Sequence, residues 1–209
     1  MPRPPILKIV EIFASLQGEG ERQGEPTLFV RLAGCNLRCR FCDTRRAWTG
    51  GRTASIESVT AECLRLRDRS GAEWVCLTGG EPLLQDVGRL ARRLRAEGFR
   101  VQVETNGRLE RRLPADWWTV SPKPPGYGTR PVYKRKASEV KLVVSRELTW
   151  AAIRRVRAAF PASIPLRLQL ESNSQVSLIR TLGFLERAAK DGLPNVRLGV
   201  QLHKILRLP

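Results

Sequence analysis

The chain has 209 residues, of which 42% are hydrophobic and 27% are charged, and its formal net charge is +17 at pH 7. This length allows one domain with a hydrophobic core and hardly two, so we expect a single domain over residues 1–209. No apolar run approaches the roughly 20 residues of a transmembrane helix. Lys8 and Glu11 also interrupt the apolar opening, which argues against a secretory signal. We therefore expect a cytoplasmic protein with no membrane partner.

The strongly basic balance has more than one interpretation. A charge of this size often indicates a nucleic-acid partner. Here the runs RLRDR, RLARRLR and IRRVR fall on the polar faces of expected helices, where charged residues usually face water. We do not expect a nucleic-acid partner on this basis, but anionic small molecules or an acidic redox protein would also be attracted. The charge alone does not decide between these.

Strands and helices are predicted to alternate along the chain. The strand-like segments, in chain order, are residues 28–34, 73–80, 99–107, 117–123, 138–145, 166–172 and 196–202. Helical spacing of apolar residues occurs at 56–66, 87–94, 152–156 and 178–185. This alternation predicts an α/β fold with a mainly parallel sheet covered by helices. With about six β/α units instead of eight, the barrel would be partial, and its chemistry should gather at the carboxyl ends of the strands.

Three cysteines, Cys35, Cys39 and Cys42, lie within eight residues directly after the first of these strands. Structural zinc normally takes four protein ligands, and His203, the one histidine, is far away in the chain. A [4Fe-4S] cluster usually takes four thiolates, so three would leave one iron open to another ligand. An iron–sulfur cluster is therefore favoured over zinc. The other two cysteines, Cys63 and Cys76, lie in apolar patterns and are predicted to be buried in the core.

The spacing Cys-x3-Cys-x2-Cys, with Phe41 before the last cysteine, resembles the signature of the radical S-adenosylmethionine superfamily. The resemblance implies a compact, partial (β/α)6 barrel in which the later β/α units can differ from the regular pattern. It also implies a [4Fe-4S] cluster whose open iron is chelated by S-adenosylmethionine. TGGEP at residues 78–82 is similar to the superfamily segment that contacts the amino group of the bound methionine. Carbonyl oxygens and Glu81 suit an ammonium group, and the glycines permit close approach.

A longer ordered set of motifs narrows the resemblance. SLQGEG, then PTLFVRLAGCNLRCRFCDT, TGGEP, VETNG, SPK, EVKLVV and QLHKIL together resemble the 7-carboxy-7-deazaguanine synthases over nearly the whole chain. The resemblance implies a lyase that converts 6-carboxy-5,6,7,8-tetrahydropterin to 7-carboxy-7-deazaguanine with loss of ammonia, in queuosine and 7-deazapurine biosynthesis. It implies hydrogen-atom abstraction at C6, a ring contraction supported by Mg²⁺, a flavodoxin- or ferredoxin-like electron donor, and a homodimer.

The same resemblance assigns roles to individual residues. The cluster ligands would be Cys35, Cys39 and Cys42, and the Mg²⁺ ligand would be Thr44. Contacts to S-adenosylmethionine are implied for Phe41, Asp43, Gly79, Gly80, Glu81, Glu104, Ser121, Pro122 and Lys123. Contacts to the pterin are implied for Leu16, Gln17, Gly18, Arg31, Thr78, His203 and Pro209. No protein side chain is assigned a catalytic role beyond the cluster and the cofactor radical.

The chemistry of four of these residues suits the ligands. The Gln17 amide both donates and accepts, as a flat heterocycle requires, and Arg31 can hold a carboxylate in a bidentate manner. The Thr44 hydroxyl is a hard oxygen ligand of the kind that Mg²⁺ takes together with water. His203, taken to lie at the end of a strand, could hydrogen-bond the pterin through either ring nitrogen.

Two other classes of function stay open from the sequence. The first is another radical enzyme of the same superfamily, either a glycyl-radical activase or a tRNA-modifying enzyme. The second is a basic, zinc-stabilised nucleic-acid-binding module, which would leave TGGEP and QGEG unexplained. Aromatic residues, at 6%, are also sparse for stacking on single-stranded nucleic acid.

Overall fold

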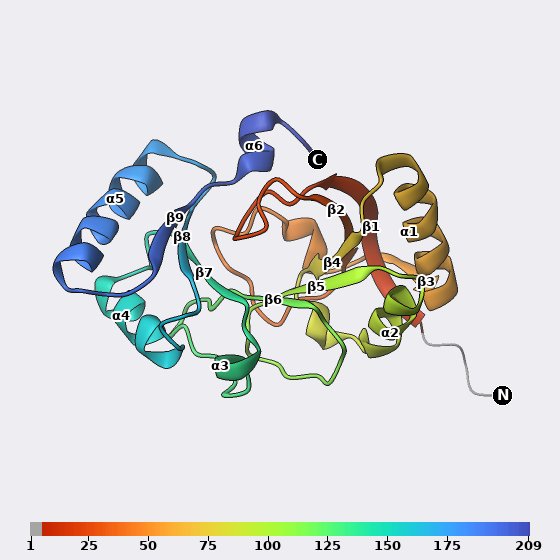
Figure 1. Ribbon diagram of the computed structural model, residues 1–209, viewed down its shortest axis with the longest axis horizontal. Helices are drawn as coiled ribbons and strands as arrows, with labels where there is room; N and C mark the ends of the chain where they lie inside the picture. Colours follow the sequence, from red (N-terminus) through yellow and green to blue (C-terminus); the bar gives the residue numbers. More distant parts are fainter. Residues whose placement is uncertain (1–5) are drawn as a thin grey trace.

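The computed structural model describes residues 6–209, which contain one nine-stranded sheet (Figure 1). The strand order is β3-β1-β2-β4-β5-β6-β7-β8-β9. The strands are β1 (Ile6–Leu16), β2 (Pro26–Leu32), β3 (Arg52–Ser55), β4 (Trp74–Gly79), β5 (Arg100–Thr105), β6 (Trp117–Val120), β7 (Glu139–Val144), β8 (Leu166–Leu170) and β9 (Val196–Gly199). From β2 to β9 neighbouring strands pair in parallel, whereas β1 pairs antiparallel with both β2 and β3.

Helices cover the outer side of this curved sheet (Figure 1). They are α1 (Ile56–Ser70), α2 (Gly88–Ala96), α3 (Tyr133–Lys136), α4 (Trp150–Ala159) and α5 (Gln175–Lys190). The short helix α6 (Leu202–Leu206) lies at the mouth of the barrel instead, and short 3-10 turns occur at η1 (Arg45–Ala47) and η2 (Pro82–Leu84). Polar caps start the longer helices: Ser55, Thr149 and Ser174 each accept a hydrogen bond from a backbone N–H of the first turn. Gly71, in the left-handed region at φ 68°, ends α1.

Alternation along the strands separates a core from a cavity. Leu28, Val30 and Leu32 on β2 are fully buried and belong to one hydrophobic cluster under the helices, as do Val101 and Val103 on β5. The residues between them point to the other side of the sheet, because side chains alternate along a strand. These inward residues include Phe29 and Arg31 on β2, Glu104 on β5 and Lys141 on β7, and all four line a cavity.

The sheet is an incomplete barrel, as the sequence predicts. Strands β3 and β9 are its two edges, and they do not pair with each other. Every predicted parallel strand and each longer predicted helix is present. The predicted burial of Cys63 and Cys76 is also confirmed, since both are fully buried.

The sequence does not predict four elements, namely β1, β3 and the short helices α3 and α6, nor the two 3-10 turns. Strands β1 and β3 extend the sheet beyond β2. The expected strand over residues 196–202 ends at Gly199, and Leu202 begins helix α6. His203 therefore lies in a short helix and not at the end of a strand, because the chain turns after β9 to cross the mouth of the barrel (Figure 1).

The loop between β1 and β2, residues 17–25, links the two sides of the open barrel. Glu19 pairs with Lys141 on β7, and Glu21 pairs with Arg167 on β8 and Arg197 on β9. The amide of Gln23 donates to the backbone oxygens of Gly18 and Val200. This β1–β2 loop thus holds the last three strands against the first two.

None of the helices in the described part of the chain is both long and apolar enough to cross a membrane.

Candidate active site

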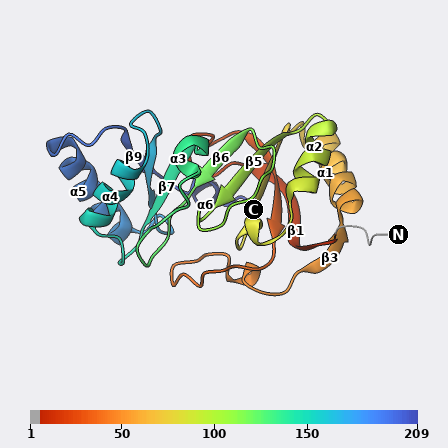
Figure 2. The same ribbon diagram turned by 90° about the horizontal axis from the view of Figure 1, so that it is seen from below.

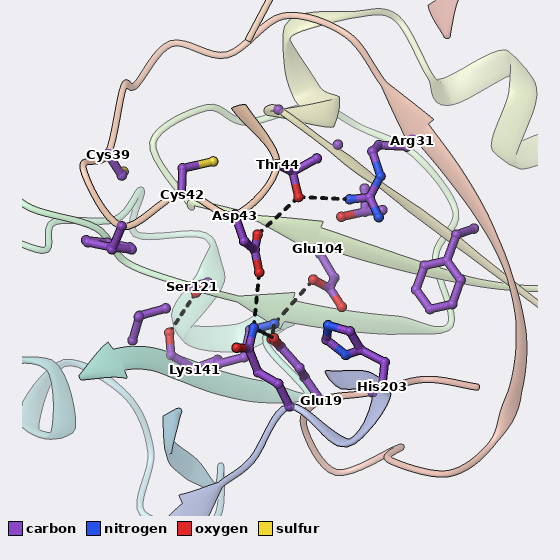
Figure 3. Close-up of a pocket in the computed structure, with 18 of the residues that line it drawn as sticks. Glu19, Arg31, Cys39, Cys42, Asp43, Thr44, Glu104, Ser121, Lys141 and His203 are labelled. Carbon is purple, nitrogen blue, oxygen red and sulfur yellow. Dashed lines mark hydrogen bonds and ion pairs between the residues drawn. The ribbon is translucent and has the colours of Figure 1, made fainter. Parts of the chain in front are cut away.

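A cavity of about 260 Å³ opens at the carboxyl ends of the strands and extends inward to the β1–β2 loop (Figure 3). Its lining includes nearly every residue to which the resemblance gives a role, from the cysteine loop to Pro209. Two of these residues, Glu81 and Pro122, do not line it. Segments far apart in the sequence therefore meet at one site.

The segment between β2 and β3, residues 33–51, carries the three cysteines and projects from the sheet (Figure 2); it is called the cysteine loop below. Cys35, Cys39 and Cys42 all line the cavity as free, half-buried thiols. Burial raises the pKa of the Cys35 and Cys39 thiols above the usual value. Within residues 6–209 no three His, Cys, Asp or Glu side chains are already gathered closely enough to hold a metal ion.

Glu81 supports the TGGEP turn from behind the cavity wall. Its carboxylate, fully buried, accepts hydrogen bonds from Leu83 N at 3.1 Å, Thr105 Oγ1 at 2.8 Å and Asn106 N at 2.8 Å. Burial raises the pKa of this carboxyl, and the three hydrogen bonds oppose that shift. Gly80 packs so tightly that an added Cβ would lie 2.1 Å from the backbone oxygen of Gly34. The glycine is thus required by the close contact between two loops.

Lys141 lies at the centre of a charged group on the cavity floor (Figure 3). Its ammonium donates to Glu19 at 2.5 Å and to Glu104 at 3.3 Å, and its side chain is 6% exposed. Burial opposes ionisation of Glu19, but the Lys141 charge and the hydrogen bonds from Lys141 and Gln201 together outweigh it, and the pKa of Glu19 is lowered. The Gln201 amide then connects Glu19, at 2.7 Å, with Asp43, at 3.1 Å, on the cysteine loop.

Beside this group, Lys123 donates to the hydroxyl of Ser121, and both residues line the cavity. Burial lowers the pKa of Lys123, and the neighbouring Lys141 charge lowers it further. The cavity floor thus combines two lysines with two glutamates.

Thr44 and Arg31 meet at the other side of the cavity (Figure 3). The Thr44 hydroxyl donates to Asp43 Oδ1 at 3.1 Å and accepts from Arg31 Nη1 at 3.4 Å. Arg31 also pairs with Glu11 at 2.6 Å, and Arg46 pairs with the same carboxylate. The Arg31 guanidinium is therefore already held in place on the cavity wall.

The C-terminal segment closes the mouth of the cavity. Leu202 N donates to Gly18 O at 2.9 Å, and Lys204 pairs with Asp43 at 3.0 Å. The His203 ring lies directly over Gly18, where an added Cβ would be 2.0 Å from Nδ1, so only glycine fits there. Burial lowers the pKa of His203 below 6.5, which favours a neutral ring. Pro209 lines the cavity, and its backbone oxygen accepts from Ser15.

Sequence reasoning missed several lining residues. Phe13 and Phe29 stack with their ring centroids 5.1 Å apart at the cavity wall. Glu19, Lys141 and Gln201 form the charged group described above. A lysine in the middle of the apolar strand EVKLVV was the available signal, since a buried lysine requires acidic partners. Glu19 lies within the QGEG motif itself.

Known proteins are similar to this chain both in sequence and in fold. The model of the radical SAM superfamily matches residues 29–117. A 7-carboxy-7-deazaguanine synthase from Synechocystis sp. is 32% identical over 200 residues, which cover 95% of this chain and 91% of the relative. The crystal structure of QueE from Escherichia coli has a TM-score of 0.79 at 30% identity and covers 95% of both chains.

The chain belongs to the 7-carboxy-7-deazaguanine synthase family. A family member from Methanospirillum hungatei is 50% identical over 103 residues, but these are 48% of this chain and 42% of that relative. Against several such relatives the alignment spans only about half of the relative's length.

Membership of this radical SAM family implies a [4Fe-4S] cluster and S-adenosylmethionine. The donor set fits a cluster with one open iron, because three free thiols, and no fourth cysteine of the described chain, line the cavity. Binding of iron must displace the thiol protons and draw the loop together.

Proposed function

We propose that this synthase family member converts 6-carboxy-5,6,7,8-tetrahydropterin to 7-carboxy-7-deazaguanine, with loss of ammonia, in queuosine and 7-deazapurine biosynthesis. One observation carries the proposal. The three thiols and the groups suited to a pterin acid, namely the Gln17 amide, the Arg31 guanidinium and the His203 ring, line the same cavity. A substrate held by these groups lies beside the cluster loop.

The chain's own residues bind and orient the two ligands. Cys35, Cys39 and Cys42 would hold the cluster, and the cluster with S-adenosylmethionine would supply the radical that removes hydrogen from C6. The backbone of Gly79 and Gly80 would hold the methionine end of the cofactor, and Phe41, Asp43, Ser121 and Lys123 would contact the rest of it. Glu104 accepts from the ribose hydroxyls. Glu81 and Pro122 act through the loops that they support.

On the substrate side, Arg31 holds the carboxylate, since a guanidinium matches its two oxygens. Leu16, Gln17, Gly18, Thr78 and His203 surround the ring, with Pro209 at the mouth. The neutral His203 ring both donates and accepts, so it can hold a ring nitrogen and move a proton at that position. Phe13 and Phe29 exclude water beside the substrate.

We further propose Mg²⁺ at Thr44. The local donor set is the Thr44 hydroxyl with the Asp43 carboxylate beside it, both hard oxygen ligands. Arg31 donates to that hydroxyl at 3.4 Å, and the second lone pair of the hydroxyl oxygen remains for the ion. Water and substrate oxygens would complete the coordination.

The remaining proposals concern the whole chain. One sheet and one large hydrophobic cluster support a single domain over residues 1–209, of which residues 1–5 lie outside the described part. We propose a cytoplasmic homodimer that is reduced by an acidic flavodoxin- or ferredoxin-like protein. The exposed arginines Arg38, Arg40 and Arg45 on the cysteine loop support this donor, because among residues 6–209 none of them has an acidic partner within 4.0 Å.

Anaerobic reconstitution tests the function. The protein is loaded with iron and sulfide, reduced, and given S-adenosylmethionine, Mg²⁺ and 6-carboxytetrahydropterin, and the product is identified by mass. We expect 7-carboxy-7-deazaguanine and ammonia from the native chain, and neither from Cys39→Ala. Cys63→Ala, which removes a buried cysteine outside the cavity, should keep both cluster and product. Deoxyadenosine without the deazaguanine would move the chain to another reaction of the superfamily, and bound zinc without iron would overturn the proposal.

A further inference from the structure

A chain of buried polar side chains leads to Gln17 from outside the cavity. Arg22 Nη1 donates to Gln102 Oε1 at 2.5 Å, and Gln17 Nε2 donates to the same oxygen at 3.1 Å. Gln102 Nε2 in turn donates to Thr119 Oγ1 at 3.0 Å. All four side chains belong to residues that are at most 3% exposed, so water does not compete for these bonds.

The groups at the two ends of this series of side chains fix the donor and the acceptor of each hydrogen bond. A guanidinium can only donate, so Arg22 forces the oxygen of the Gln102 amide toward itself. That oxygen can only accept from Gln17. An ionised carboxylate can only accept as well, and Glu104 Oε1 accepts from Gln17 Nε2 at 3.2 Å.

Both hydrogens of the Gln17 amide are therefore used within the protein. Its remaining polar atom is Oε1, which accepts from the backbone N–H of Glu19 at 3.2 Å and keeps a second lone pair. Because Gln17 lines the cavity, it offers a ligand an acceptor and no donor.

We propose that Arg22, a positioning residue outside the cavity lining, fixes the Gln17 amide as a hydrogen-bond acceptor and thereby makes the cavity select heterocycles that present an N–H donor there. A pterin carries a 2-amino group, whereas a lumazine carries a carbonyl oxygen at the same ring position. A carbonyl facing the Gln17 oxygen places two acceptors against each other and leaves the ligand oxygen without a donor in the cavity, which costs roughly tenfold or more in affinity. This inference rests on the proposed function, because it assumes a pterin-like ligand in the cavity.

The experiment compares two fluorescent probes, 6-carboxypterin and 6-carboxylumazine, titrated anaerobically into the cluster-loaded enzyme with S-adenosylmethionine. The native enzyme should bind the pterin about tenfold more tightly than the lumazine, and Arg22→Met should reduce that ratio to about threefold or less. With the true substrate, Arg22→Met should raise KM while kcat changes little. Arg100→Met is the matched control, because Arg100 stacks on the same Trp74 ring, at 4.1 Å against 3.4 Å for Arg22, but does not contact Gln102.

A second pair of variants keeps the test valid if Arg22→Met does not fold. Gln102→Glu retains an acceptor toward both Arg22 and Gln17 and should keep the pterin preference, whereas Gln102→Met removes the acceptor and should lose it. If Arg22→Met or Gln102→Met left the ratio of pterin to lumazine affinity unchanged, or if Arg100→Met reduced that ratio as much as Arg22→Met does, the inference would be overturned. The proposed function would be unaffected by either result. A native enzyme that binds neither probe would overturn the proposed function and this inference with it.

Discussion

The ammonium group of Lys141 lies between the carboxylates of Glu19 and Glu104, in a strand whose neighbouring residues are apolar. Replacing it by methionine would leave two half-buried carboxylates without their cation. We expect Lys141→Met to lower the free energy of unfolding by about 3 to 5 kcal/mol at neutral pH. Urea denaturation of the two proteins measures this. Lys190→Met, which removes an exposed ion pair with Glu186, should leave the free energy of unfolding nearly unchanged.

The pH dependence of stability gives the Lys141 variant a second signature. Despite burial, Lys141 holds the pKa of Glu19 below 4.5, so the stabilisation is complete above that pH and is lost as pH falls through the lowered pKa. The pKa of Lys141 is raised, so its contribution persists to above pH 10.5. In Lys141→Met the cation is gone, so burial is opposed only by the Gln201 hydrogen bond and the pKa of Glu19 rises. When the pH is lowered from about 7.5 to about 5, the free energy of unfolding of the variant should therefore rise. In the native protein the ion pair keeps Glu19 ionised over this range, so this group should cause no change. A variant that loses stability on acidification would contradict this account.

Glu81 belongs to the TGGEP motif, which suggests contact with a ligand, but its carboxylate hydrogen-bonds only to other groups of the protein. Its removal in Glu81→Ala leaves Leu83 N, Asn106 N and the Thr105 hydroxyl without their acceptor. We expect a loss of at least about 2 kcal/mol of unfolding free energy, in the absence of any ligand. Denaturation of the metal-free protein measures it, with Glu186→Ala at an exposed site as the control. If Glu81→Ala weakened only cofactor binding and left stability unchanged, the carboxylate would be a ligand contact after all.

At the scale of elements, the sequence predicts what periodicity encodes and misses what contacts between elements decide. Strands β4 and β7 are evident from their apolar patterns, and the cysteine spacing points to the loop after β2. Strand β1 contains Lys8 and Glu11, which interrupt its pattern. They are tolerated because Lys8 pairs with Thr53 at the sheet's edge and Glu11 holds Arg31 in the cavity. No local sequence pattern indicates the ion pairs from the β1–β2 loop to β7, β8 and β9, because the paired residues lie more than a hundred positions apart in the chain.

The β1–β2 loop provides the prediction at this scale. Gly20 has φ 78°, and an added Cβ would lie 2.3 Å from the buried carboxylate of Glu139. Gly24 has φ 92°, with no atom within 4 Å of the added Cβ. Gly24→Ala should therefore cost about 1 kcal/mol for backbone strain alone, and Gly20→Ala about 2 kcal/mol more. Gly20→Ala should also raise KM for the pterin, because it displaces the loop that carries Gln17. Equal stabilities of the two variants would show that contact with Glu139 does not hold the loop.

At the scale of the whole molecule, the arginines that contribute to the net charge of +17 have different effects according to where they lie. Arginines on α1 and α2 lie on the outer helical layer, whereas Arg38 and Arg45 flank the Trp48 ring on the cysteine loop, at 6.0 and 5.8 Å from its centroid. A net positive field attracts an acidic protein from any side, but only arginines near the thiols orient it for electron transfer. The net charge should therefore set the encounter rate and the cysteine loop should set the productive orientation.

This division predicts distinct effects of salt and of substitution on reduction by an acidic flavodoxin. Raising the ionic strength from about 0.05 M to about 0.5 M should slow reduction by roughly tenfold, since exposed charges are then screened within a few ångströms. Reduction by photoreduced deazariboflavin, a neutral molecule, should stay constant, which excludes an effect of salt on the cluster itself. Stopped-flow absorbance of the cluster measures both rates.

Position is then separated from total charge by two triple variants that each replace three arginines with serine. The first variant replaces three arginines of the cysteine loop, Arg38, Arg40 and Arg45. The second replaces three exposed arginines of the outer helices, Arg69, Arg89 and Arg92. Both lose three charges, so a purely long-range field would slow reduction equally in the two. We expect the cysteine-loop variant to be slower than the helix variant by about tenfold at low salt, because it loses the orienting contacts as well. Equal rates would mean that the donor docks elsewhere on the molecule.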